Sequence, residues 1–176
     1  MRLNDMITAE RIIDRDTLAF EAFVDAHKTR VFNYCLGFVG DHHIAEELAQ
    51  EVFLKVYRNI TSYDWKKASL ATWMYRIARN TCLNHVRDNS HQHSENIDSY
   101  SMAAAVHSQT ELDNRIMLFQ AFARLAPAER DLVILKDYLG LGYRDVGRIL
   151  DMPVGTVKSR LHAIRAKLRL ILGDER

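Results

Sequence analysis

Basic side chains gather in two stretches of this chain, although the chain as a whole is almost neutral. The 176 residues include 24 Lys and Arg against 23 Asp and Glu, a formal net charge of +1. Residues 55–88 and residues 142–169 nevertheless each carry a clear excess of Lys and Arg. Positive charge concentrated in two separate segments suits two contacts with a polyanion such as nucleic acid.

The first basic stretch also carries aromatic and amide side chains. Over residues 61–87, aromatic residues lie between the cations, at Tyr63, Trp65, Trp73 and Tyr75. Aromatic faces beside cations suit unpaired bases, which stack at roughly 1–3 kcal/mol each. Asn80 and Asn84 are one helical turn apart, and their amides can pair with base edges. This chemistry suits single-stranded nucleic acid better than a duplex.

The second basic stretch has the pattern of a helix-turn-helix. Residues 143–150 form a short amphipathic segment in which Gly147 allows close packing, and Pro153 is expected at the first position of the next helix. That helix has an apolar stripe at Val157, Leu161, Ile164 and Leu168. Its opposite face presents Lys158, Ser159, His162, Arg165 and Arg169. Such a helix fits the major groove of a duplex, although a helical hairpin with an ordinary solvated basic face remains an alternative.

A third surface is acidic. The expected helix over residues 43–58 has an apolar stripe that includes Leu48 and Val52. Its polar side carries Glu46, Glu47, Gln50 and Glu51. An acidic and amide face suits a basic protein partner rather than DNA.

These surfaces are expected on helices. Only two prolines and seven glycines occur, and apolar residues recur at three- and four-residue steps, which predicts an all-α protein. Helices are expected within 17–60, with Asp41 as an N-cap, and over 70–88, 112–125, 128–139 and 143–150. Residues 89–109 are rich in Ser, Asn, His and Gln and indicate a linker. The sequence therefore predicts two small helical domains, 15–90 and 112–173, joined by a linker over 91–111.

Several function classes find no support. No apolar run reaches the roughly 20 residues of a membrane span, and the charged N-terminus does not fit a signal peptide, so a cytoplasmic location is expected. Cys35 and Cys82 are expected to be reduced thiols in helices. The histidines lack metal-ligand spacing, and no nucleophile or carboxylate cluster is evident. We expect no metal, no cofactor, no small-molecule substrate and no enzymatic activity.

Three segments together resemble a bacterial sigma factor of the extracytoplasmic-function (ECF) type. The stretch DHHIAEELAQEVFLKVYRN at 41–59 is similar to the family's polymerase-binding helix. The stretch ATWMYRIARNTCLNHVR at 71–87 is similar to its −10 helix, and residues 125–168 resemble sigma region 4, which reads the −35 element. The resemblance implies a dissociable subunit of RNA polymerase that binds promoter DNA, both duplex and single-stranded.

The resemblance also implies roles for individual residues. The expected contacts with the largest polymerase subunit are Glu46, Glu47, Gln50, Glu51 and Lys55. The expected −10 contacts are Tyr63, Trp65, Lys66, Arg76, Arg79, Asn80 and Asn84, with Trp73 assigned to the core. The expected −35 contacts are Tyr143, Arg144, Thr156, Lys158, Ser159, His162 and Arg165.

Further partners follow from the family. Region 4 is expected to contact the polymerase flap, and many relatives are held inactive by an anti-sigma factor, often at the inner membrane. An autonomous helix-turn-helix regulator remains the alternative, and it would bind a duplex tightly by itself.

Overall fold

A computed structural model describes residues 2–88, 120–122 and 124–173. Every regular element in these ranges is helical, and none of the described residues lies in a strand, so the expected all-α class is confirmed. The chain divides into two compact units. The predicted linker, residues 91–111, lies outside the described ranges, as does most of the helix expected over 112–125.

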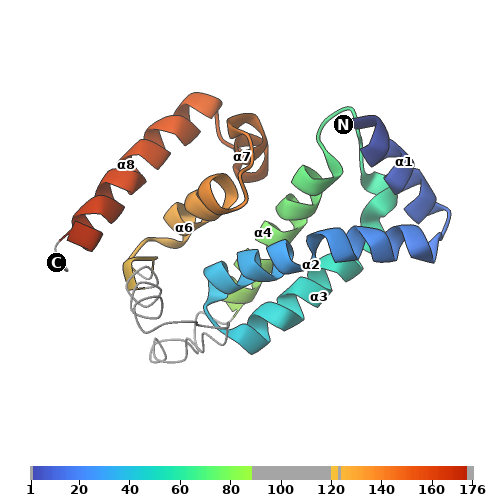
Figure 1. Ribbon diagram of the computed structural model, residues 1–176, viewed down its shortest axis with the longest axis horizontal. Helices are drawn as coiled ribbons and strands as arrows, with labels where there is room; N and C mark the ends of the chain where they lie inside the picture. The colour runs from blue at the N-terminus through green and yellow to red at the C-terminus, as the bar shows by residue number, and fades with distance from the viewer. Residues whose placement is uncertain (1, 89–119, 123, 174–176) are drawn as a thin grey trace. The chain divides into compact units, whose positions relative to one another are not determined.

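The N-terminal unit contains four α-helices. They are α1 (Arg2–Ile13), α2 (Thr17–Val39), α3 (His42–Asn59) and α4 (Leu70–Asp88), with a short 3₁₀ turn, η1 (Ile60–Ser62), after α3. In this unit α2 packs along α3 and α4, and α1 packs against α2 (Figure 1). The fully buried side chains at the centre include Val31, Tyr34, Val52, Val56 and Met74.

Short polar side chains start two of these helices. The side chain of Asp41 accepts a hydrogen bond from the Ile44 amide at 2.9 Å, which confirms the expected N-cap. Asp16 caps α2 in the same way through the Ala19 amide at 3.0 Å. Gly40 ends α2 with a φ of 79°, a left-handed conformation that glycine adopts without steric cost. The sharp corner between α2 and α3 is therefore encoded locally.

The structure adds helix α1, which apolar spacing did not predict. Ala9 and Ile12 are buried, whereas Leu3 and Ile7 are exposed. Apolar residues thus lie on the exposed side of the helix as well as on its buried side, so the periodic signal is weak. Packing against α2 supplies the stabilisation that a 12-residue helix does not have by itself.

The C-terminal unit contains α6 (Pro127–Val133), η2 (Ile134–Tyr138), α7 (Tyr143–Leu150) and α8 (Val154–Gly173). The helix expected over 128–139 is present, but its second half, η2, is a π-helical turn rather than α-helix. There the Leu139 amide donates to the Ile134 carbonyl, five residues back, at 2.9 Å. A π turn accommodates one extra residue per turn and changes which side chains face the neighbouring helix.

Both thiols lie in the N-terminal unit. Cys35 on α2 and Cys82 on α4 are free and fully buried. They behave as small apolar core residues, as expected from the sequence.

Candidate nucleic-acid and polymerase interfaces

The connection between α7 and α8 is a tight turn. Asp151 ends α7 in a left-handed conformation with a φ of 55°, and the Met152 amide donates to the Gly147 carbonyl at 2.8 Å. The helix α8 begins at Val154, one residue later than expected, because the Pro153 carbonyl accepts the first helical hydrogen bond from the Val157 amide. Pro153 therefore lies just outside the helix, where its missing N–H leaves no donor unsatisfied.

Gly147 is required by close packing against this turn. A Cβ atom at Gly147 would lie 2.7 Å from the Met152 carbonyl oxygen. The close approach expected at this glycine is present: the nearest atom belongs to the backbone of the turn, and the Val157 side chain of α8 lies 3.8 Å from the same Cβ position.

Helix α8 separates its apolar and polar residues as the sequence predicts. Of the predicted apolar stripe, Val157, Leu161 and Ile164 are buried, whereas Leu168 is half-buried. Lys158, Ser159 and His162 are exposed, and Thr156 and Arg165 are half-buried. The Ser159 hydroxyl donates to the Thr156 carbonyl at 3.1 Å, so it binds the helix backbone. A row of polar side chains from Lys158 to Arg165 is thus presented to solvent along one side of α8.

Tyr143, at the first position of α7, lies between two lysines. The Nζ atoms of Lys136 and Lys158 lie 4.8 Å and 5.5 Å from the centre of its ring. Lys136 also donates to the Leu141 carbonyl at 3.0 Å. The ring thus attracts a cation from η2 and a cation from α8. Lys136 is not among the residues predicted from the sequence to contact DNA, because only the fold brings it beside Tyr143.

Arg165 is engaged by a carboxylate of η2. Its Nη2 donates to Asp137 Oδ1, and its Nε donates to Asp137 Oδ2 at 3.2 Å. This two-point contact raises the pKa of Arg165 above its ordinary value, and contact with Tyr143 adds to the effect. This predicted −35 contact therefore already has a charged partner within the protein.

A second ion pair joins α6 to α8. Lys167 Nζ lies 2.8 Å from Glu129 Oε2, which also accepts a hydrogen bond from the Ala126 amide. The bond from Lys167, and then that from Ala126, lowers the pKa of Glu129. This carboxylate both caps the start of α6 and anchors α8.

The residues predicted to bind a basic protein partner lie on the polar side of α3. Glu46, Glu47, Gln50 and Glu51 are exposed, and Leu54 extends the same face as an exposed apolar side chain. Lys55 differs from the others because its Nζ contacts both Glu51 Oε1 at 2.6 Å and the Thr81 hydroxyl of α4 at 3.1 Å. Lys55 therefore connects two helices within the N-terminal unit.

The aromatic residues of the first basic stretch divide between surface and core. Trp65 is 38% exposed, and the Lys66 ammonium lies 5.7 Å from the centre of its ring. Tyr63 packs beside Trp73 at 5.6 Å between ring centres and donates its hydroxyl to the Ala68 carbonyl at 3.0 Å. Tyr75 is buried in the core. Trp65 is thus the aromatic group of this stretch that is most open to a base.

The polar residues of α4 follow one side of the helix. Arg76, Asn80 and Asn84 are spaced four residues apart, and all three are exposed. Arg87 further on is also exposed, whereas Arg79 is half-buried. Four-residue spacing stacks side chains along a helix. The fold therefore brings these predicted −10 residues into one row.

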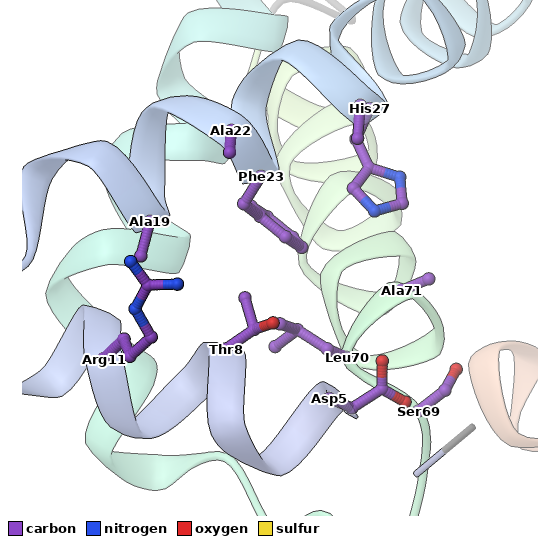
Figure 2. Close-up of a pocket in the computed structure, with 11 residues that line it drawn as sticks. Asp5, Thr8, Arg11, Ala19, Ala22, Phe23, His27, Ser69, Leu70 and Ala71 are labelled. Carbon is purple, nitrogen blue, oxygen red and sulfur yellow. The ribbon is translucent and has the colours of Figure 1, made fainter. Parts of the chain in front are cut away.

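A pocket of about 440 Å³ lies between α1, α2 and the start of α4 (Figure 2). Asp5, Arg11 and His27 line it, and none of the predicted contact residues does. His27 stacks on Phe23 at 4.7 Å between ring centres. Burial, together with the charge of Arg30, lowers the pKa of His27, and Asp5 opposes this effect.

Two further classes of site are absent from the described residues. No described helix is both long enough and apolar enough to cross a membrane. Within the same ranges, His, Cys, Asp and Glu side chains form no cluster of three or more that could hold a metal ion.

Comparison with known proteins identifies both halves of the chain. Residues 23–92 match the model of Sigma-70 region 2, and residues 115–168 match that of Sigma-70, region 4. The ECF RNA polymerase sigma factor SigW of Bacillus subtilis is 33% identical over 90% of this chain and 91% of its own length. The RNA polymerase sigma-H factor of Pseudomonas aeruginosa is 30% identical, covering 92% and 90%.

Two solved structures share the fold. CnrH, determined with the cytosolic domain of CnrY, gives a TM-score of 0.76 at 18% identity over 98% of this chain and 99% of that chain. The sigma factor RpoE of Bartonella quintana, determined with the anti-sigma factor NepR, gives 0.72 at 22% identity over 89% and 98%. Since both sigma regions are matched in order and a relative is similar over nearly its whole length, the chain belongs to the ECF RNA polymerase sigma factors.

Proposed function

We propose that this protein associates with core RNA polymerase and directs initiation at promoters that carry a −10 and a −35 element. The observation that carries this proposal is the order of three surfaces in one sigma-factor chain. These surfaces are the acidic face of α3, the aromatic and basic residues of 63–87, and the exposed polar side of α8. The protein itself does no covalent chemistry in this scheme.

The helix α8 would read the −35 element in the major groove. Its N-terminal residues Thr156, Lys158 and Ser159 would meet base edges, and His162 and Arg165 would lie further along the groove. Tyr143 and Arg144, at the start of α7, would contact the DNA backbone. Exposure of Arg144 and Lys158 supports these roles.

The row on α4 would read the −10 element. Asn80, with Arg76, Arg79 and Asn84 beside it, would pair with base edges and phosphates. Trp65 and Lys66 would receive an unstacked base, because an exposed ring beside a cation stabilises it. Tyr63 would position this loop through its bond to Ala68 rather than stack on a base itself.

The exposed acidic side of α3 would bind a basic helix of the largest polymerase subunit. Charge complementarity over Glu46, Glu47 and Glu51 would guide association, with Gln50 adding an amide. Lys55 would act indirectly, through its bonds to Glu51 and Thr81. The C-terminal unit would contact the polymerase flap.

Control by an anti-sigma factor is part of the proposal. The solved relative RpoE was determined with the anti-sigma factor NepR, which supports the same kind of partner for this protein. We propose a cytoplasmic location, with tethering at the inner membrane if that partner is itself membrane-bound.

Run-off transcription tests the proposal directly. Core polymerase is assayed with and without this protein on promoter fragments from the source genome. Protein-dependent transcripts from fragments that share paired −10 and −35 elements are expected. If the protein yields no transcripts but binds a palindromic duplex tightly by itself, it is an autonomous helix-turn-helix regulator instead.

The polymerase-binding face has its own test. Glu47→Lys should weaken association with core polymerase by about tenfold or more, because it places a cation opposite a basic partner. Glu21→Lys, the same charge change at an exposed position of α2, is the matched control and should leave association unchanged. Equal effects of the two variants would contradict the assignment of α3.

The −10 row is tested by Asn80→Ala. This variant should lose transcription from matched promoters while its binding to core polymerase stays normal. Loss of polymerase binding would instead show that Asn80 has a structural role.

A further inference from the structure

The ion pair between Asp137 and Arg165 lies within the surface assigned to −35 DNA. Arg165 follows Lys158 by seven residues, about two helical turns, so both side chains lie on the same side of α8. Lys158 in turn lies over Tyr143, which also holds Lys136. A carboxylate of η2 is therefore placed among the cations that would meet the phosphates.

The ion pair with Asp137 uses part of the hydrogen-bonding capacity and the charge that Arg165 could present to DNA. Two of its five N–H groups are directed at the two oxygens of Asp137. The Asp137 and Arg165 side chains are 35% and 40% exposed, so solvent and ligands reach both. A phosphate that approaches Arg165 would meet a guanidinium whose charge is already balanced.

Charge balance matters because duplex binding by cations depends on the counterions that they release from DNA. Each phosphate neutralised steepens the slope of log K against log salt by about 0.9. A neutral Asp137–Arg165 pair adds a hydrogen-bond donor but little net charge. The carboxylate itself also repels nearby phosphates.

We propose that Asp137 acts as an internal competitor for the DNA backbone, holding Arg165 and thereby limiting the affinity and salt dependence of −35 binding. A DNA phosphate must either displace Asp137 from Arg165 or contact Arg165 while Asp137 still neutralises its charge. This role deepens the proposed function and rests on it. It makes η2, the π-helical turn that presents Asp137, a determinant of promoter strength that lies outside the recognition helix.

The test uses holoenzyme reconstituted from core polymerase and a promoter duplex identified by run-off transcription. Asp137→Asn keeps the shape of the side chain and an oxygen acceptor for Arg165, but it removes the charge. We expect tighter binding, by about fivefold near 0.15 M salt, and a salt slope steeper by about 0.9. Affinity is measured by fluorescence anisotropy between about 50 and 200 mM salt.

Glu129→Gln is the matched control. It makes the same change in net charge and frees Lys167, which follows Lys158 by nine residues, about two and a half turns, and so lies on the opposite side of α8. It should leave the slope unchanged. Equal steepening in both variants would show that net charge alone is responsible and would overturn the proposal.

A double variant identifies the group that is released. In an Arg165→Gln background, Asp137→Asn should no longer tighten binding. A gain that persists without Arg165 would overturn the proposal, and so would weaker binding of Asp137→Asn at an unchanged slope, which would show that Asp137 positions Arg165 for DNA. Failure of the unmodified protein to support any transcription would refute the proposed function rather than this role.

Discussion

Gly147→Ala is expected to destabilise the C-terminal unit, even though alanine is the better helix former. The new Cβ would lie 2.7 Å from the Met152 carbonyl oxygen, a backbone atom in the turn that joins α7 to α8. Relief of such an overlap requires the turn to move, at a cost typical of overpacking, about 1–3 kcal/mol. The intrinsic helix preference of alanine offsets about 1 kcal/mol. The net loss should therefore be up to about 2 kcal/mol.

Gly155→Ala is the matched control, because a Cβ at Gly155, in the first turn of α8, has no atom within 4 Å. This variant should be neutral or more stable by up to about 1 kcal/mol. The two variants are compared by urea unfolding followed by far-UV circular dichroism. Trp65 and Trp73 both lie in the N-terminal unit, so tryptophan fluorescence reports that unit separately. If Gly147→Ala is as stable as Gly155→Ala, the packing argument for the turn is wrong.

Three further predictions concern the caps and the titrating side chains. Asp41→Ala removes the oxygen that accepts from the Ile44 amide and should cost about 1 kcal/mol in the tryptophan-monitored transition, whereas Asp41→Asn should cost less. The pKa of Glu129 is lowered by its bonds to Lys167 and the Ala126 amide. The ionised Glu129 therefore contributes its full stabilisation of the fold above the ordinary pKa of 4.5, and this contribution is lost as the pH falls through the folded-state pKa. Glu129→Gln should make unfolding seen by circular dichroism less sensitive to acid. The pKa of His27 is lowered below 6.5 by burial. The unfolded chain therefore binds more protons, and the stability of the fold should fall as the pH drops below 6.5. His27→Gln should reduce this pH dependence of unfolding in the tryptophan signal, and an unchanged dependence would exclude His27 as its source.

Features that depend on neighbouring residues in the chain could be predicted from the sequence. The N-cap at Asp41 and the short connection before Pro153 follow from local chemistry, since a short oxygen side chain satisfies free amides and proline lacks an N–H. The apolar stripe of α8 follows from its spacing, and Val157, Leu161 and Ile164 are buried as expected. The all-α class and the helix-turn-helix rest on these local signals.

Two elements that depend on packing could not be predicted from the sequence. Helix α1 carries apolar residues on its exposed side as well as on its buried side, so its spacing gives no clear period, and it is stabilised by burial of Ala9 and Ile12 in the N-terminal unit. The π turn η2 also has no sequence signal, because Ile134–Tyr138 looks like a continuation of α6. Tertiary contacts decided both elements.

The candidate contact residues show the same division. Their types and helical phases follow from the sequence, which placed Glu47, Asn80 and Lys158 on exposed faces. The sequence by itself therefore determined most of the helices, their polar sides and the resemblance to the family. The partners of the long side chains required the fold, since Arg165 meets Asp137 across 28 positions and Lys55 meets Thr81 across 26. Helical periodicity relates residues only within one helix, so which cation remains available to DNA was decided by the tertiary structure alone.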